Sequence, residues 1–322
     1  MPPGPRVLVV RFSSLGDVVL TTPLLRAIRS RHPAAFVTVV VQARYADVLA
    51  GNPAVNAIVP VEPREPVAGM AHRLAPAAYD ARLDLQDSFR SRGLRRALGG
   101  AWGVADRRRA ARLLLIWLGL DTYGAYVPAA ERYFSAAGGL DLRPDKAPPE
   151  VFPTVDDEAR AAELAPRECV ALAPGARWGS KRWPARHWRA LADRLLARGL
   201  GVVAVGGAEE RELLSGPGIA EAYGLSLSTT AAVLRRARVV VANDSGMLHL
   251  ATAVRRPVIA LVGPTAPAFG YLPYGVPAQV LERPLACRPC SPSGSDHCPL
   301  GHHRCMIEIE PEAVAAAVEG AA

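Results

Sequence analysis

The chain of 322 residues lacks a hydrophobic run that could cross a membrane. Its longest wholly apolar stretch of that kind, residues 113–118, is far shorter than the about 20 residues that a spanning helix needs. Residues 1–12 lack the basic, apolar and small-residue order of a secretory signal, and residues 7–12 instead predict a first strand. We therefore expect a cytoplasmic protein, with peripheral contact to the inner face of the cytoplasmic membrane left open.

Several motifs of nucleotide and hydrolase chemistry are also missing. The sequence has no GxxxxGK[ST] phosphate loop, no GxSxG nucleophile elbow and no Asp-x-Asp pair for a divalent metal on a nucleotide diphosphate. Residues 199–204 resemble GxGxxA, but they precede a predicted strand, whereas a dinucleotide fingerprint follows one. These absences exclude the P-loop and dinucleotide classes.

Lysine is scarce, with only Lys146 and Lys181 among 38 basic residues. The 30 acidic residues leave a net charge of +8, which weakly suggests an anionic partner. Nucleic acid is not the partner that we expect, because zinc-finger and helix-turn-helix spacings and an aromatic stacking platform are all missing. An ammonium is a compact point charge, so a retained lysine is more informative than one arginine among many.

What is present is a repeated alternation of strands and helices in a chain that is 50% apolar. This alternation predicts parallel βαβ units, hence an α/β protein with two Rossmann-like domains facing a central cleft. The Pro- and Asp-rich residues 141–157 predict a linker, which divides the chain into domains 1–150 and 151–322. Strands are expected at residues 7–12, 36–41, 57–61, 82–86, 169–173, 202–206, 239–242 and 257–262. Helices are expected up to about residue 31 and at 185–198, 209–214, 229–236, 245–254 and 312–318.

Three motifs follow predicted strands, where ligands of such sheets bind. The first, RFSSLGDV, places Asp17 where a carboxylate could take a proton from a substrate hydroxyl. Asp17 could instead cap a helix, although Thr22 and Pro23 already form a suitable cap and first-turn pair.

The second motif, residues 173–184, combines glycines, Ser180 and the adjacent cations Lys181 and Arg182. It predicts a diphosphate cradle, with a solvated loop as the alternative. In the third, ANDSGMLHL, Asp244 or Ser245 caps a helix whose free N–H groups and dipole form an anion site, and His249 lies on the same face. A simple cap with a satisfied histidine is the alternative.

Together these motifs resemble glycosyltransferase family 9, the ADP-heptose:lipopolysaccharide heptosyltransferases. The resemblance covers nearly the whole chain, including LDLQDSFRSR in the middle and GPT at residues 263–265. It implies a GT-B fold whose final helix returns to the first domain. It also implies inverting transfer of heptose from an ADP-heptose donor to the lipid A-linked inner core, with no cofactor required for catalysis.

The resemblance further assigns residues to roles. Asp17 matches the catalytic base and Lys181 the lysine that pairs with donor phosphate, and Glu209 lies near an acidic residue that faces the nucleoside. The donor set is Gly175, Ser180, Lys181, Glu209, Asp244, Ser245, Gly246, His249 and Thr265. The acceptor set is Arg11, Ser13, Ser14, Gly16, Gln86 and Arg90. Alternatives are a nucleotide-sugar-binding assembly protein without turnover and a family member with another sugar donor.

Two further segments each allow more than one interpretation. Residues 90–112 hold eight arginines and one acid, Asp106, directly before the apolar residues 113–118. An anionic glycolipid acceptor at a membrane would suit this pairing, and a solvated helix face with a buried segment is the alternative. Four cysteines, Cys287, Cys290, Cys298 and Cys305, could hold a structural zinc ion, remain free thiols or form a local disulfide.

Overall fold

The computed structural model describes residues 4–321, which form two compact units. Unit 1 comprises residues 4–107 and 127–152, and unit 2 comprises residues 108–126 and 153–321. The chain passes into the second unit within the predicted linker, two residues beyond the expected boundary. Residues 108–126 differ from the expectation, because they belong to unit 2 although both of their flanks belong to unit 1.

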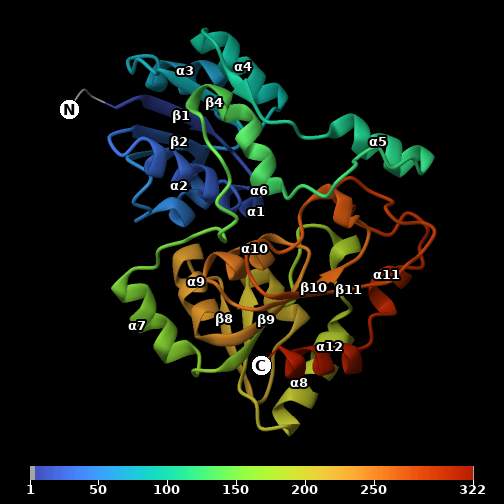
Figure 1. The fold of residues 1–322 in the computed structure, drawn as a ribbon. Helices are drawn as coiled ribbons and strands as arrows, with labels where there is room; N and C mark the ends of the chain where they lie inside the picture. Colours follow the sequence, from blue (N-terminus) through green and yellow to red (C-terminus); the bar gives the residue numbers. More distant parts are fainter. Residues whose placement is uncertain (1–3, 322) are drawn as a thin grey trace. The chain divides into compact units, whose positions relative to one another are not determined.

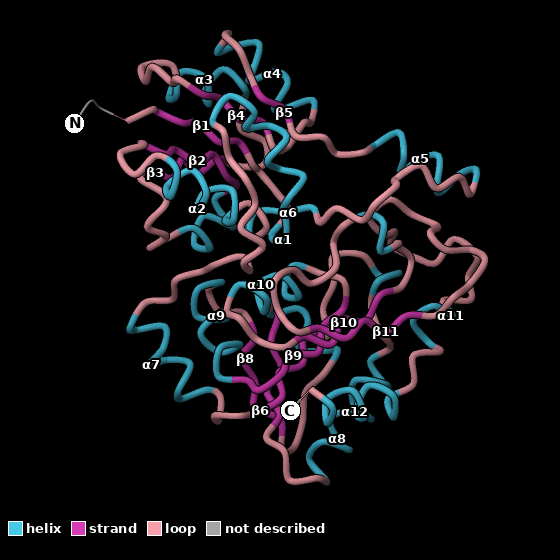
Figure 2. Tube along the Cα trace, viewed as in Figure 1, coloured by secondary structure: helices cyan, strands magenta, loops and turns pink. Residues whose placement is uncertain are grey.

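Unit 1 is built on a five-stranded parallel sheet with the order β3-β2-β1-β4-β5 (Figures 1 and 2). Residues 7–10 of β1 are fully buried, as expected for a central strand of a parallel sheet that is covered on both faces. Its strands are β1 (Arg6–Val10), β2 (Phe36–Gln42), β3 (Ala57–Val61), β4 (Ala81–Asp84) and β5 (Gly103–Val104). Its helices are α1 (Leu15–Val19), α2 (Thr22–Arg31), α3 (Val67–Leu74), α4 (Phe89–Leu98) and α6 (Ala129–Arg132).

Unit 2 contains a six-stranded parallel sheet with the order β11-β10-β9-β6-β7-β8. Its strands are β6 (Cys169–Ala173), β7 (Val202–Gly206), β8 (Ile219–Tyr223), β9 (Ala237–Asn243), β10 (Val258–Val262) and β11 (Ala278–Glu282). Its helices are α5 (Arg109–Leu118), α7 (Val155–Leu164), α8 (Ala185–Ala197), α9 (Leu227–Arg236), α10 (Gly246–Ala253), α11 (Arg304–Ile307) and α12 (Pro311–Gly320). Short 3-10 helices occur in both units. Those of unit 1 are Ala43–Leu49 and Tyr133–Leu140, and those of unit 2 are Gly179–Lys181, Ala208–Leu213 and Pro267–Phe269.

The α/β class and the parallel sheets are confirmed, and some details differ from the sequence prediction. The first helix is interrupted at Leu20–Thr21, because Pro23 cannot donate the N–H that would continue α1, and α2 begins there instead. Strands β5, β8 and β11 were not predicted. The final helix, α12, packs on α8 within unit 2, where Val314 and Val318 join the core, and its implied return to the first domain stays a prediction.

Candidate functional site

Asp17 lies on α1, directly after the carboxyl end of β1. One carboxylate oxygen, Oδ2, accepts the backbone N–H of Ser14 at 3.1 Å and its hydroxyl at 3.0 Å. The other, Oδ1, accepts the Tyr133 hydroxyl at 2.9 Å and forms an ion pair with Arg11. Asp17 therefore stabilises the start of α1, in addition to any chemical role. The N-cap residue of α2 is Thr21, whereas the sequence had indicated Thr22.

The surroundings of Asp17 keep its carboxyl group ionised. Burial alone would raise its pKa, but the positive charges of Arg11 and Arg107 and the hydrogen bonds from Ser14 and Tyr133 outweigh that effect. The pKa of Asp17 lies well below its ordinary value as a result. Near neutral pH Asp17 is thus an ionised carboxylate whose charge is balanced by Arg11.

Arg11 is the buried arginine that forms the ion pair with the Asp17 carboxylate. Its side chain is only 1% exposed, donates to the carbonyl oxygen of Leu85 and lies 5.2 Å from the centre of the Tyr133 ring. Such burial argues against the acceptor contact that we expected for Arg11 and favours a role in holding Asp17. Gly16 is also buried, whereas Ser13 and Ser14 are partly exposed.

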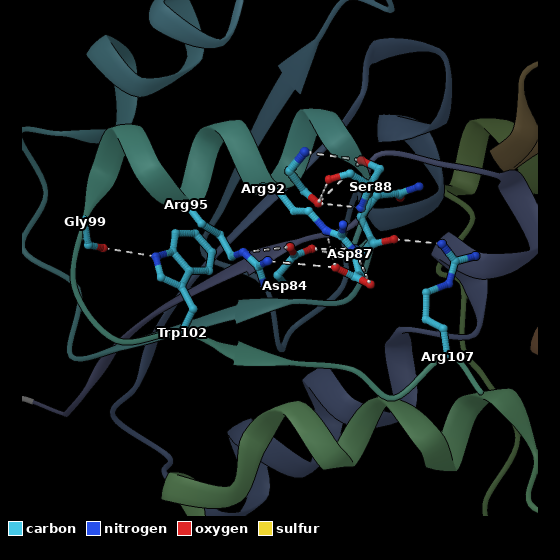
Figure 3. Close-up of polar contacts among 10 residues, drawn as sticks. Asp84, Asp87, Ser88, Arg92, Arg95, Gly99, Trp102 and Arg107 are labelled. Atoms are coloured by element: carbon cyan, nitrogen blue, oxygen red, sulfur yellow. Dashed lines mark hydrogen bonds and ion pairs between the residues drawn. The ribbon is translucent and has the colours of Figure 1, made fainter. Parts of the chain in front are cut away.

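The turn between β4 and α4 is held by Asp84, which is fully buried. Its Oδ1 accepts the backbone N–H groups of Gln86 and Asp87 at 3.0 and 2.8 Å. Figure 3 shows Arg95 reaching Asp84 and Arg92 reaching Asp87, with nitrogen–oxygen distances of 3.5 and 3.0 Å. Part of the arginine block therefore neutralises acidic residues of its own turn.

The same turn connects Gln86 to the first motif. Gln86 Oε1 accepts the backbone N–H of Ser13 at 3.2 Å, and its carbonyl oxygen accepts Arg107 Nη1 at 2.8 Å. Arg90 instead donates to the carbonyl oxygens of Glu62 and Glu65. Gln86 thus lies beside the Asp17 motif, and Arg90 supports the neighbouring loop. The acceptor contacts of both residues stay predictions.

In unit 2 a second charged cluster lies at the carboxyl ends of β9 and β10. Lys181 Nζ lies 2.7 Å from Asp244 Oδ2, which also accepts the Thr265 hydroxyl at 2.8 Å. Burial opposes the ionised form of Asp244, but Lys181, Thr265 and the nearby His249 lower its pKa below the ordinary value. The structure therefore brings together four residues that the sequence placed on the donor side.

Asn243 connects the loops around this cluster, and we did not single it out from the sequence. It is fully buried at the end of β9, and its side-chain N–H groups donate to the carbonyl oxygens of Pro174 and Gly175 at 2.8 and 3.3 Å. Its Oδ1 accepts the Trp183 backbone N–H at 3.1 Å. A polar amide at the end of an otherwise apolar strand was the signal that could have identified it.

Helix α10 begins beside Asp244, with Ser245 as its N-cap residue. The Ser245 hydroxyl is buried and makes no hydrogen bond within residues 4–321. Backbone N–H groups at a helix start carry partial positive charge and suit an anion. Ser245 and Gly246 therefore form, with Lys181, a group that could receive a phosphate.

Other predicted donor residues have different surroundings. Ser180 is buried, and its hydroxyl accepts the backbone N–H of Ser295, so it fastens a loop. Glu209 is exposed, whereas the neighbouring Glu210 packs against Gly175, where an added Cβ would lie 1.8 Å from Glu210 Oε1. Burial raises the pKa of Glu210. Glu210 is thus the acidic side chain that packs on Gly175, and the nucleoside contact of the exposed Glu209 stays a prediction.

The four cysteines of residues 287–305 lie close enough to influence one another. Burial and the charges of Cys287 and Cys298 raise the pKa of Cys290, and burial raises the pKa of Cys305 to about 11. All five cysteines of the chain are free thiols here, which does not support the local disulfide. Within residues 4–321, no three or more His, Cys, Asp or Glu side chains are placed as a metal-ligand set. The donor atoms suit zinc, but the geometry is not that of a zinc site, which stays a prediction.

Among residues 4–321, no helix has the length and apolar character to span a bilayer. Two parallel α/β sheets of this kind, with polar loops at their carboxyl edges, define the GT-B architecture of glycosyltransferases. Comparison with known proteins identifies the class of enzyme more closely. The model of glycosyltransferase family 9 (heptosyltransferase) matches residues 67–300, and the chain belongs to this family.

Three relatives illustrate the similarity. Lipopolysaccharide heptosyltransferase 1 of Pseudomonas aeruginosa is 30% identical, covering 95% of this chain and 92% of the relative. Lipopolysaccharide heptosyltransferase 2 of Salmonella typhimurium is 26% identical, covering 96% of each chain. The solved structure of E. coli heptosyltransferase WaaC with ADP has a TM-score of 0.73 and 26% identity, covering 98% of this chain and all of the other. This chain is accordingly a glycosyltransferase.

Proposed function

We propose that the protein transfers a heptose from ADP-L-glycero-D-manno-heptose to the lipid A-linked inner core of lipopolysaccharide. The observation that carries the proposal is the cluster of Lys181, Asp244 and Thr265 beside the start of α10. Relatives named as lipopolysaccharide heptosyltransferases 1 and 2, and a relative solved with ADP, support it. The donor nucleotide would bind to unit 2.

The cluster fits a leaving diphosphate. As the bond from the sugar C1 to the phosphate oxygen breaks, negative charge grows on ADP. Lys181 and the backbone N–H groups at Ser245 and Gly246 would stabilise that charge, so protein groups supply what a divalent metal supplies in other transferases. We therefore propose a reaction that needs no metal ion for the transfer step.

Asp17 is the group that we assign to the acceptor. The acceptor hydroxyl forms the new bond to C1 from the face opposite the leaving ADP, which inverts that centre, and its proton passes to Asp17. The low pKa of Asp17 makes it a weak base at rest. The attacking hydroxyl becomes strongly acidic as the new bond forms, however, and an ionised carboxylate then suffices.

Two alternatives to heptose transfer can be tested. The protein could bind a nucleotide sugar without turnover, or it could use another sugar donor. The ion-paired Asp17 and the Lys181 cluster favour turnover, because each supplies a charge that the reaction needs. Titration with ADP-heptose, ADP and UDP, followed by a transfer assay with ADP-heptose, separates the three possibilities.

The substitution Asp17→Asn tests the base. We expect transfer to fall by about 10²–10⁴-fold while ADP affinity is unchanged. The variant also leaves the buried Arg11 without its carboxylate, which costs about 3–5 kcal/mol of stability. The double variant Arg11→Met, Asp17→Asn removes that unpaired charge and should recover much of the stability but none of the turnover. Normal transfer by either folded variant would contradict the assignment.

We also propose a peripheral location on the inner face of the cytoplasmic membrane, because the acceptor is an anionic glycolipid.

The four cysteines of residues 287–305 are proposed to hold a structural zinc ion, apart from the transfer chemistry. The thiol sulfurs are suitable ligands, although their present arrangement is not that of a zinc site.

A further inference from the structure

Residues 108–126 form a hairpin around α5, here called the α5 hairpin. Arg108 Nη1 donates to the carbonyl oxygen of Tyr123 at 3.1 Å, which ties the two ends of the hairpin together. Arg112 lies over the Phe269 ring at 4.9 Å from its centre, and the Tyr123 ring lies 6.1 Å from the same ring. The base of the hairpin is therefore fastened to unit 2.

The other end of the hairpin is apolar and uncovered. In α5, none of the ten residues is fully buried. The alternative that we gave for this region, a solvated helix face followed by a buried segment at residues 113–118, is therefore wrong. Trp117 is 79% exposed and Leu118 is 64% exposed, and Leu113 and Leu120 are also more than half exposed. In Figure 2 long loops lead into and out of α5. Such a surface is costly in water unless it has a partner.

The distribution of side chains along α5 indicates which partner. The arginines lie in the first turn, and the six residues 113–118 are all apolar. Residues 114–116 are partly buried, so the uncovered apolar surface is formed by Leu113, Trp117, Leu118 and Leu120. A small apolar tip of this kind, next to basic residues, suits insertion into the interfacial layer of a bilayer.

Charge supports the same partner. Residues 107–120 contain no acidic residue, and four arginines precede the apolar turn. Arg109 is exposed, whereas Arg107, Arg108 and Arg112 also donate to carbonyl oxygens of the protein. Basic side chains next to an inserted apolar turn suit anionic lipid phosphates, and tryptophan is enriched at the membrane interface.

We propose that the tip of α5, residues 113–118, enters the interfacial layer of a bilayer that carries anionic headgroups. The inference deepens the proposed function, which rests on a lipid-linked acceptor, by naming the element that contacts the membrane. It concerns lipid binding alone, so it can fail while heptose transfer stands, and the reverse also holds.

Flotation of the full-length protein with vesicles tests the proposal. Wild-type protein should float with vesicles that contain phosphatidylglycerol, and less at high salt or with phosphatidylcholine alone. Trp117→Glu and Leu118→Glu should each weaken flotation by about tenfold or more. The matched control is Val155→Glu, because Val155 is an equally exposed apolar residue of unit 2, at the start of α7. It should float as wild type.

A second measurement locates the contact. Lipids brominated in the acyl chain should quench part of the wild-type tryptophan fluorescence, and Trp117→Phe should remove that part while still floating. Unchanged ADP affinity in every variant establishes that unit 2 is folded. Failure of the wild type to float, or equal flotation of Trp117→Glu, would overturn the proposal. A dimer without lipid that Trp117→Glu dissociates would assign the tip to a second copy instead.

Discussion

Lys181 is one of only two lysines in the chain, and it is the cation that lies against the Asp244 carboxylate. Lys181→Ala removes a charge-assisted contact to phosphate and leaves the buried Asp244 to repel the donor. We expect ADP affinity to fall by about tenfold to a hundredfold, as measured by calorimetric titration. Lys146, the other lysine, is exposed, and Lys146→Ala is the matched control. Equal ADP affinity in the two variants would refute the phosphate role of Lys181.

Single residues also mark the limit of sequence reasoning. The positions of Asp17 and Lys181 after strands followed from the alternation of strands and helices, because the carboxyl ends of parallel strands meet at one edge. The burial of Arg11 could not be read in the same way, because it depends on Tyr133, which is more than a hundred residues away in the sequence. Likewise, nothing in the sequence distinguishes Glu210 from Glu209 until the close approach of Gly175 is known.

Among the elements, buried strands were the most predictable. The bounds of β6 and β7 match the expected ranges, because short β-branched and alanine-rich runs between turn residues fit a parallel sheet that is buried on both faces. Strands β5, β8 and β11 lie at sheet edges and were missed. Strand β5 has only two residues, and β8 and β11 have partly exposed residues and a weaker pattern. Helix α5 shows a related limit. An apolar run beside arginines allowed both a membrane contact and a buried segment, because the sequence does not say in which medium the run is buried.

The segment of residues 287–305 gives a prediction at the same scale. If its four thiols hold zinc, elemental analysis of purified protein should find about one zinc ion per chain. Cys287→Ser with Cys290→Ser should remove the metal and lower the thermal stability of unit 2. Cys169→Ser is the matched control, because Cys169 lies in the core of β6, outside the segment, and should retain the zinc. Protein purified without added chelator and free of zinc would end this proposal.

For the molecule as a whole, the proposed donor residues belong to unit 2 and the proposed base belongs to unit 1. Hydrogen exchange with and without ADP tests this division. ADP should slow exchange in the loops that contain Lys181, Ser245 and Thr265, and should leave the peptide with Asp17 unchanged, because bound ligand stabilises the segments that it contacts. The protection should disappear in Lys181→Ala. If ADP instead slowed exchange mainly in the peptide with Asp17, the nucleotide would bind to unit 1, and the proposed division would be wrong.

The single amide of Asn243 has a practical meaning for anyone who scans this enzyme by mutagenesis. It joins the carbonyl groups of Pro174 and Gly175 to the backbone of Trp183, so a disturbance at any one of these loops is transmitted to the others. A survey that scores lost nucleotide affinity will therefore flag positions that never touch the nucleotide. Such a map outlines the shared scaffold of the loops, and the true ligand contacts are the subset whose loss leaves that scaffold undisturbed.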